Sequence, residues 1–115
     1  MEECIFCQII KGDLPSKKVL ENERVVAFWD IHPQAPFHIL VIPKKHISSL
    51  VEANEDDKEI LGELFLAANK VAKILGFQEN GFRVIVNVGA DGGMIINHLH
   101  LHVLGGKYLG SKLIK

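Results

Sequence analysis

A strictly alternating segment, HLHLHVLGG, runs from His98 to Gly106 and restricts the possible folds more than any other part of the chain. Neighbouring residues of a β-strand point to opposite faces, so the three histidines share one face and the apolar residues between them share the other. The pattern therefore predicts a strand with one side in a core and a row of imidazoles on its other side. The alternative is a half-buried strand whose solvent side is histidine by chance, but polar strand faces more commonly use Thr, Lys, Glu and Ser.

The spacing of the three histidines indicates that they do not all bind one metal ion. A strand rises by about 3.3 Å per residue, which separates His98 from His102 by about 13 Å. Zinc–nitrogen bonds measure about 2.0–2.1 Å, so two neighbouring histidines can reach one ion but the outer pair cannot. Because imidazole also serves as nucleophile, acid or base near neutral pH, we expect the three rings to have different roles.

The remaining pattern predicts an α+β fold. One long helix is expected at residues 55–75, with Asn54 as its N-cap and Gly76 in the left-handed position after its end. The apolar stripe of this helix is unusually wide, which favours contact with a second subunit. A shorter helical turn is expected at residues 48–52. Five apolar or alternating runs are typical of antiparallel strands, at residues 18–22, 24–30, 37–43, 81–89 and 96–104.

Composition limits the classes of partner. The chain has 115 residues, 48% of them hydrophobic, which is enough for one domain with its own core over residues 1–115. The formal net charge is −1, and no block of Lys or Arg indicates nucleic acid or an anionic membrane as a partner. No apolar run approaches the length of a transmembrane helix, and the acidic start MEECIFCQII lacks the features of a signal peptide. We therefore expect a cytoplasmic protein.

The two cysteines, Cys4 and Cys7, form a CxxC pair. A disulfide is disfavoured in a reducing compartment. The pair is then half of a metal site, a redox pair or two buried thiols.

A glycine-rich turn, Gly89–Gly93, precedes the histidines. Gly92 and Gly93 can let backbone N–H groups approach an anion closely. Glycines between strands are usually only turn residues, but beside three histidines they suggest a phosphate held against an imidazole.

Several motifs, in the same order, resemble the histidine triad (HIT) superfamily. HLHLHVL is similar to its His-x-His-x-His-x-x signature. Residues 4–47 are similar to the N-terminal half of the HINT-like branch, the nucleoside phosphoramidase type, and VNVGADGG resembles the segment before that branch's triad. The resemblance covers nearly the whole chain. It implies the HIT fold, with a short N-terminal helix added to the elements above, and a homodimer.

The resemblance implies an enzyme that binds purine nucleotides. Proteins of this branch hydrolyse nucleoside phosphoramidates, such as that of AMP, or aminoacyl-adenylates at the α-phosphorus through a nucleotidyl–histidine intermediate. Carried over to this chain, His100 is the nucleophile and His102 contacts the phosphate and assists the leaving group. His38 corresponds to a fourth active-site histidine, which orients the others or relays a proton.

The resemblance also implies substrate-binding residues. Asp30 corresponds to the acidic residue that binds ribose hydroxyls, and Asn87 to an asparagine on the phosphate or ribose side. Gly93, in the glycine turn, is a further candidate contact for the phosphate. The positions that line the family's base pocket correspond to Ile5, Phe6, Ile9, Phe28, Ile31 and Leu40.

A zinc site follows from the same resemblance. In some members a CxxC pair binds zinc together with two histidines, which correspond here to His46 and His98. With Cys4 and Cys7 they complete a closed tetrahedral set, the pattern of a structural zinc site. His98 would then hold the metal while His100 and His102 face the phosphate. The alternative is a pair of inert buried thiols.

Two residues depart from the family pattern. Many relatives have Gln-Ser or Gln-Thr after the glycine pair, whereas this chain has Met94 and Ile95. Losing a charge-assisted hydrogen bond from that hydroxyl costs roughly 1.5–3 kcal/mol, or about tenfold to a hundredfold in rate. The departure keeps open a nucleotide-binding dimer with little or no turnover. A metal-dependent hydrolase is a third possibility, which the closed ligand set disfavours.

Overall fold

The structure is a computed structural model that describes residues 4–114. It has an α+β fold with one five-stranded antiparallel sheet, in the order β1-β2-β3-β5-β4, one long helix and a short N-terminal helix, as the sequence predicted. Two 3₁₀ turns, Leu50–Glu52 and Glu55–Asp57, precede the long helix. The helices and strands are α1 (Ile5–Lys11), β1 (Lys18–Glu21), β2 (Val25–Trp29), β3 (Phe37–Pro43), α2 (Lys58–Leu75), β4 (Phe82–Ile85) and β5 (Leu101–Gly105).

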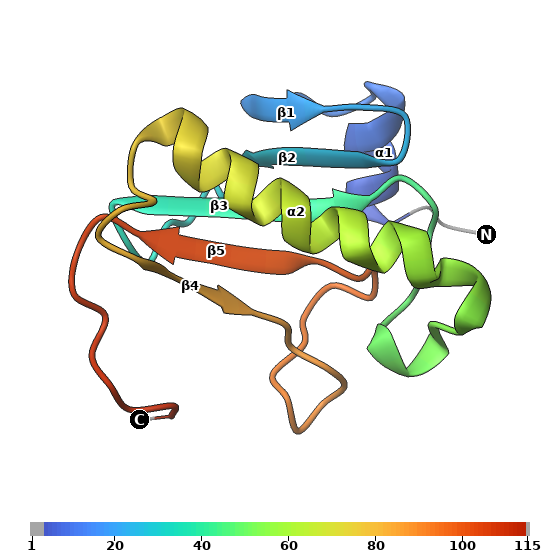
Figure 1. Ribbon diagram of the computed structural model, residues 1–115. Coiled ribbons are helices and arrows are strands. Elements are labelled where there is room, and N and C mark those ends of the chain that lie inside the picture. Colours follow the sequence, from blue (N-terminus) through green and yellow to red (C-terminus); the bar gives the residue numbers. More distant parts are fainter. Residues whose placement is uncertain (1–3, 115) are drawn as a thin grey trace.

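Helix α2 covers one face of the sheet (Figure 1). Its buried stripe packs against the alternate strand residues that point toward it, because the pleat sends every second side chain to this face. The helix ends at Gly76, whose φ of 84° is the left-handed conformation that glycine adopts without strain. The core on this side includes Val25, Ala27, Ile39, Val41, Leu64, Ala67, Ala68, Val71, Leu101 and Val103.

The start of the long helix differs from the prediction. Residues Glu55–Asp57 form a 3₁₀ turn, and the α-helix begins at Lys58. Asn54 is a cap, as expected, and its side chain accepts a hydrogen bond from Asp56 N. Asp57 in turn accepts one from Asn54 N, which completes a capping box. This reciprocal pair tightens the first turn, which is common at helix N-termini.

Helix α1 lies behind the sheet in Figure 1 and covers only part of its second face. Phe6 and Ile9 of α1 pack on Phe28, Leu40 and other residues of β2 and β3 that point away from α2. The rest of this face, along β3, β5 and β4, stays open. The register pairs Leu40 with His102 and His38 with Leu104, which puts both histidines on the open face.

The segment of alternating histidines is regular strand only from Leu101 onward, and β4 ends at Ile85 rather than near residue 89. The backbone before β5 bonds to the connection between β3 and α2 instead of to a neighbouring strand, since Leu99 N donates to Ile47 O over 2.7 Å. The alternation of faces nevertheless continues, because Leu99 is buried in the same core as Leu101. His98 and His100 therefore lie opposite the α2 core although they precede the strand.

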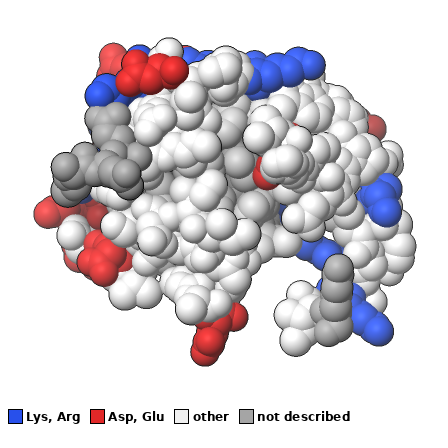
Figure 2. All heavy atoms as spheres, turned by 180° about the vertical axis from the view of Figure 1, so that it is seen from behind, with Lys and Arg blue, Asp and Glu red and all other residues white. Residues whose placement is uncertain are grey.

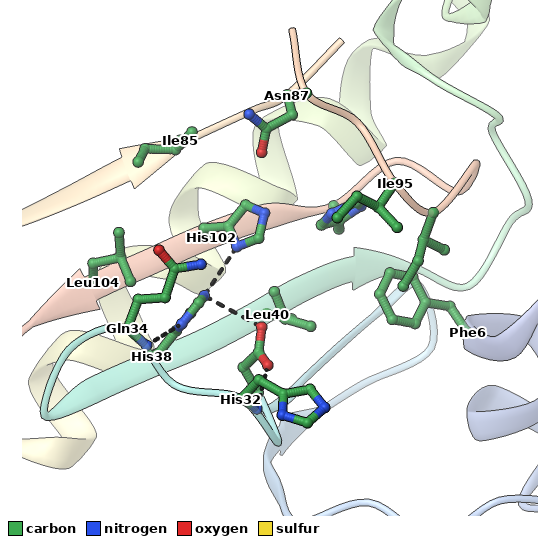
Figure 3. Close-up of a pocket in the computed structure, with 14 residues that line it drawn as sticks. Phe6, His32, Gln34, His38, Leu40, Ile85, Asn87, Ile95, His102 and Leu104 are labelled. Carbon is green, nitrogen blue, oxygen red and sulfur yellow. Dashed lines mark hydrogen bonds and ion pairs between the residues drawn. The ribbon is translucent and has the colours of Figure 1, made fainter. Parts of the chain in front are cut away.

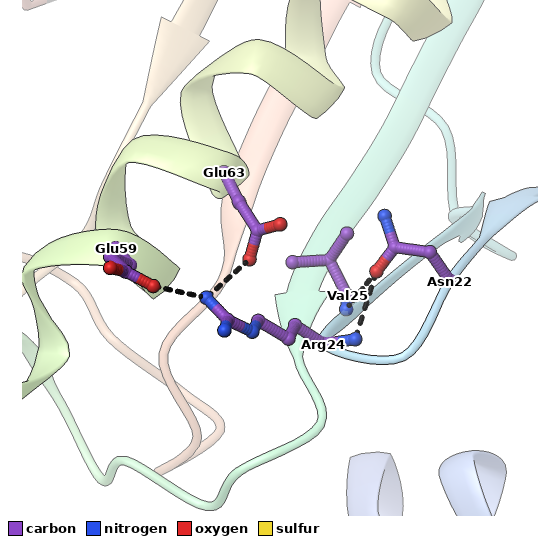
Figure 4. A network of polar contacts seen from close by, with 5 residues as sticks. All are labelled: Asn22, Arg24, Val25, Glu59 and Glu63. Atoms are coloured by element: carbon purple, nitrogen blue, oxygen red, sulfur yellow. Dashed lines mark hydrogen bonds and ion pairs between the residues drawn. The ribbon is translucent and has the colours of Figure 1, made fainter.

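A surface network ties α2 to the β1–β2 turn (Figure 4). Arg24 Nη1 lies 2.8 Å from Glu59 Oε2 and 3.4 Å from Glu63 Oε2. The Asn22 side chain accepts hydrogen bonds from the N–H groups of Arg24 and Val25 and shapes the turn that presents the arginine. Ion pairs between exposed side chains contribute little to stability, so this network adds to the α2 packing without determining it. Within residues 4–114, no helix combines the length and the apolar character needed to cross a bilayer.

Candidate active site and metal-ligand cluster

A pocket of about 510 Å³ opens on the face of the sheet that α2 does not cover (Figure 3). Phe6 of α1 lies at one end, and strands β3, β4 and β5 form its floor. The loop between β4 and β5 closes one side. The lining residues are Phe6, Asp30, His32, Gln34, His38, Leu40, Ile85, Asn87, Gly93, Ile95, Ile96, His100, His102 and Leu104.

Most of the residues named from the sequence meet in this pocket. All three predicted catalytic histidines line it, as do Asp30, Asn87, Gly93, Phe6 and Leu40. The structure places four predicted base-pocket residues elsewhere. Ile9 and Phe28 are buried beneath Phe6, whereas Ile5 is partly exposed and Ile31 is 83% exposed.

Other lining residues were not predicted. Ile85 pairs with His102 and Leu104 with His38, and Leu104 follows His102 by two residues, so strand parity could have found them. His32 and Gln34 belong to the β2–β3 loop, where the sequence pattern indicated only a turn. Their position between Asp30 and His38 is the signal that could have indicated them.

His100 is held with one ring nitrogen free for chemistry. It is buried, and its Nδ1 lies 2.7 Å from the backbone oxygen of His98. A carbonyl oxygen only accepts hydrogen bonds, so Nδ1 carries the proton and donates it. In the neutral ring the lone pair is then on Nε2, which is the form a nucleophilic imidazole requires.

A chain of hydrogen bonds fixes the other two histidines. Gln34 N donates to His38 Nδ1 over 3.1 Å, so His38 carries its proton on Nε2. His38 Nε2 lies 2.9 Å from His102 Nδ1 and donates to it, which leaves the proton of neutral His102 on its own Nε2 (Figure 3). His102 can therefore offer an N–H to a ligand.

Burial keeps this pair of rings uncharged. Desolvation, helped by the neighbouring His100 and His38 and opposed by Asp30, lowers the pKa of His102 to about 4. Burial also lowers the pKa of His38, while the carboxylate of Asp30 opposes that shift. Both rings are therefore neutral at pH 7.

Asp30 holds the loop against the histidines. Its Oδ1 accepts a hydrogen bond from His32 N at 2.8 Å, and its Oδ2 lies 3.4 Å from His38 Nε2. Asp30, His38 and His102 are close enough to ligate one ion. A neutral His38 that bound a metal through Nε2 would carry its proton on Nδ1, facing the N–H of Gln34. The hydrogen-bond chain therefore favours a proton network over a metal at these three residues.

The glycine turn, where the sequence predicted a contact to phosphate, forms hydrogen bonds within its own backbone. Gly93 N bonds to Ala90 O and Met94 N bonds to Gly89 O, both at 3.0 Å, so these two N–H groups are used within the turn. Gly92 is required by packing, because a Cβ there would overlap the backbone oxygen of Val88. The side chain of Asn87 donates to Gly92 O over 2.7 Å and joins the turn to the pocket.

The pocket has no strongly basic side chain among its described lining residues and is partly apolar. Among its described lining residues none is Lys or Arg, and Asp30 is the one carboxylate. Figure 2 shows this side of the molecule, where uncharged atoms dominate and charged side chains lie mostly at the margin. Ile95 is 91% exposed at the pocket wall, where family members with Ser or Thr would place a hydroxyl. Hydrogen bonds and apolar contacts are the interactions that this lining can offer to a ligand.

Four further side chains converge at the N-terminal end of α1, and we call them the Cys/His cluster: Cys4, Cys7, His46 and His98. Their sulfur-to-nitrogen distances range from 3.3 to 3.7 Å, and the two Nδ1 atoms are 3.1 Å apart. Tetrahedral zinc bonds would give about 3.5 Å between sulfur and nitrogen and about 3.3 Å between the nitrogens. The donor set therefore fits a tetrahedral metal ion.

The surroundings of His98 support the same fit. Its Nε2 donates to the backbone oxygen of Pro43 over 2.8 Å, so the lone pair of the neutral ring is on Nδ1, toward the cysteines. A backbone carbonyl in this role is the usual partner of a metal-bound histidine. Both cysteines are thiols rather than a disulfide. The cluster is consistent with a metal site.

Comparison with known proteins agrees with the motifs and the fold. The model of the HIT domain matches residues 11–109. The chain belongs to the HIT family. It is 49% identical over 107 residues to an uncharacterized HIT-like protein of Buchnera aphidicola, a match that covers 93% of this chain and 96% of the relative.

Solved structures of HIT proteins share the whole fold. A HIT family hydrolase from Clostridium thermocellum superposes with a TM-score of 0.96 at 49% identity and covers 99% of both chains. A histidine triad nucleotide-binding protein from Candida albicans superposes with a TM-score of 0.80 at 31% identity, over 97% of this chain and 87% of that one. The HIT fold predicted from the sequence is thus confirmed.

Proposed function

We propose that this HIT protein is a hydrolase of purine nucleoside phosphoramidates or aminoacyl-adenylates and that His100 is its nucleophile. One observation carries the proposal: the bond from His100 Nδ1 to the His98 carbonyl leaves the Nε2 lone pair of a neutral ring at the pocket. The solved relative from Clostridium thermocellum, described as a HIT family hydrolase, supports the reaction class.

The reaction would take two displacements at the α-phosphorus. In the first, His100 Nε2 forms a bond to phosphorus while the bond to the leaving group breaks, and the leaving nitrogen of a phosphoramidate takes up one proton. In the second, water attacks phosphorus, the bond to His100 breaks and AMP is released. The attacking water gives up one proton, so the protons balance over the cycle. A covalent intermediate divides one difficult hydrolysis into two easier steps.

His102 and His38 would position the phosphate. Because His38 donates to His102 Nδ1, His102 can present its Nε2–H to a phosphoryl oxygen next to the leaving group. Neutral donors that are already oriented can stabilise charge that develops on that oxygen.

The two ends of the pocket suit the two parts of a nucleoside. Asp30 would accept hydrogen bonds from ribose hydroxyls, with Asn87 and Gly93 on the phosphate side. Phe6 and Leu40 offer apolar surface to a base, and the nucleotide-binding protein from Candida albicans supports a nucleotide as the ligand. The remaining predicted base-pocket residues would support or border that surface, namely Ile5, Ile9, Phe28 and Ile31.

A second candidate function is nucleotide binding with little or no turnover. Ile95 favours it, because an exposed isoleucine on the pocket wall cannot donate a hydrogen bond to phosphate or leaving group.

We propose zinc as the ion of the Cys/His cluster, since two thiolates and two imidazoles are the ligand set of structural zinc sites. A bound zinc ion would cross-link α1 to the segments that carry His46 and His98 and would take no part in the displacements.

We also propose that the chain forms one domain over residues 1–115 and a homodimer. Partly exposed apolar side chains on α2, including Phe65, Leu66 and Ile74, support a second copy as the partner, and β4 is an edge strand. Light scattering should report twice the mass of one chain, and a monomer would rule the dimer out.

Incubation with adenosine 5′-phosphoramidate and with a lysyl-adenylate mimic tests the reaction. The wild type should release AMP and His100→Ala should not, whereas His32→Ala, which changes an exposed histidine of the same pocket, should still release AMP. Tight AMP binding without release by the wild type would support the binding protein instead. Activity that chelation abolishes but His100→Ala retains would indicate a metal-dependent hydrolase.

A further inference from the structure

The Cys/His cluster lies directly beside the candidate nucleophile. We propose that an ion bound in this cluster holds His100 in its reactive orientation and that Phe6 is the positioning residue between the two. The part of this proposal that concerns reaction rate rests on the proposed function, whereas the part that concerns the His100 ring does not.

The first connection runs through the backbone of His98. The side chain of this residue belongs to the cluster, with Nδ1 3.3 Å from Cys4 Sγ, and its carbonyl oxygen accepts the hydrogen bond from His100 Nδ1 at 2.7 Å. The other nitrogen of His98 donates to Pro43 O. An ion on Nδ1 would therefore fix a ring that is already held on its far side. The carbonyl of the same residue, and with it the acceptor for His100, would then be fixed as well.

The second connection is Phe6, which lies between the two cysteines of the CIFC segment. Its buried ring makes edge contacts with His98 at 5.8 Å and with His100 at 5.2 Å between ring centroids. Bonds from an ion to Cys4 and Cys7 would fix the backbone on both sides of Phe6. The ring would then be held against the His100 imidazole.

Helix α1 needs such an anchor because it has only 7 residues. Helices this short are not stable alone. Without an ion, the contacts of the cluster are weak interactions between thiols and imidazoles at 3.3–3.7 Å. Loss of the ion should therefore loosen the start of α1, move Phe6 and allow the His100 ring to leave the His98 carbonyl.

The ring state of His100 can be measured by nitrogen-15 NMR on the full chain loaded with zinc, with cobalt used in parallel to monitor the site by its absorption. The loaded wild type should show His100 as a single tautomer with its proton on Nδ1. Chelation, or the ligand substitution His46→Asn, should convert it to a mixture of tautomers in a chain that stays folded by circular dichroism. His46 also contacts His98 directly, with 4.8 Å between ring centroids, so the ion is the cause only if chelation of the unsubstituted chain gives the same mixture as His46→Asn.

The rate part uses single-turnover formation of the nucleotidyl–His100 adduct from adenosine 5′-phosphoramidate. Misplacement of a reacting group by about 1 Å costs up to about a hundredfold in rate, so metal removal should slow adduct formation by about tenfold to a hundredfold. If the loaded wild type forms no adduct, the proposed function fails while the NMR result still decides the coupling.

Phe6→Ala separates the positioning role from metal binding. The loaded variant should keep the cobalt absorption of the wild type and yet show mixed tautomers at His100. Ile10→Ala is the matched control, since it shortens another apolar side chain of α1 that packs against the same hydrophobic core as Phe6. It should leave the His100 signal unchanged. If chelation unfolds the chain, the loaded Phe6→Ala protein decides alone. A single Nδ1–H tautomer in that variant, or in a folded metal-free chain, would overturn the proposal.

Discussion

His102 should make the stability of this protein fall in mild acid by an amount that can be isolated. Its pKa is lowered by burial from 6.5 to about 4. As the pH falls, the unfolded chain therefore binds the proton before the folded chain does, and folding becomes less favourable. The stability that neutral His102 contributes is complete above pH 6.5 and is lost progressively down to about pH 4. A pH of 5.0 lies about 1.5 units below the ordinary pKa of 6.5, which corresponds to at most about 2 kcal/mol at about 1.4 kcal/mol per unit, and solvent screening of this partly exposed ring reduces the loss.

Urea unfolding at pH 7.5 and pH 5.0 measures this loss. His102→Asn keeps an acceptor for the N–H of His38 but takes up no proton, so the wild type should lose up to about 2 kcal/mol more than the variant between the two pH values. Any metal loss in acid is common to both proteins and cancels in the difference. His32→Asn controls for removing one imidazole from the pocket and should follow the wild type. Equal losses in the wild type and His102→Asn would refute the reasoning.

Three further predictions concern single side chains. Ile95→Ser places a hydroxyl at the pocket and should raise kcat/KM for adenosine 5′-phosphoramidate by about tenfold to a hundredfold. Val51→Ser, which changes an exposed residue away from the pocket, should not raise it. Equal values of kcat/KM for Ile95→Ser and the wild type would show that the hydroxyl is not needed. Cys4→Ser should remove the metal measured by mass spectrometry of the native protein, and full occupancy in the variant would contradict the ligand set. Gly105→Ala should destabilise the fold by about 1–3 kcal/mol in urea, because its Cβ would overlap the ring of Phe77. Gly62→Ala, in open space on α2, should instead stabilise it by up to about 1 kcal/mol; loss of stability at both sites would argue against overlap as the cause.

Much of the fold could be predicted because its elements have strong local signals. The apolar period of α2, the glycine after its end and the alternation around His102 each depend on nearby residues. The start of α2 could not be predicted as well, since the capping box of Asn54 and Asp57 tightened the first turn. The predicted last strand begins too early, at residue 96 instead of Leu101. An alternating pattern does not show that the backbone of Leu99 bonds to Ile47 rather than to a neighbouring strand.

The candidate site could be predicted as a set of residues but not as a set of protonation states. The alternation of residues along a strand was enough to place the histidines on one face and the leucines between them on the other. The proton positions depend on the partners of each ring, and the carbonyl of His98 and the N–H of Gln34 belong to backbone groups that no sequence motif identifies. The exposure of single residues could not be predicted either. Ile31 and Phe28 are equivalent in an apolar pattern, yet Ile31 is exposed and Phe28 is buried.

The absence of Lys and Arg from the described lining of the pocket determines how a ligand would arrive. With no fixed cation to attract a phosphate over distance, encounter would proceed by ordinary diffusion, and its rate would change little with ionic strength. Selectivity would then arise after contact, when the imidazole donors meet the oxygens around phosphorus. An uncharged mimic of a phosphoryl group should consequently lose none of its association rate at this pocket, which makes neutral inhibitors a practical starting point for this site.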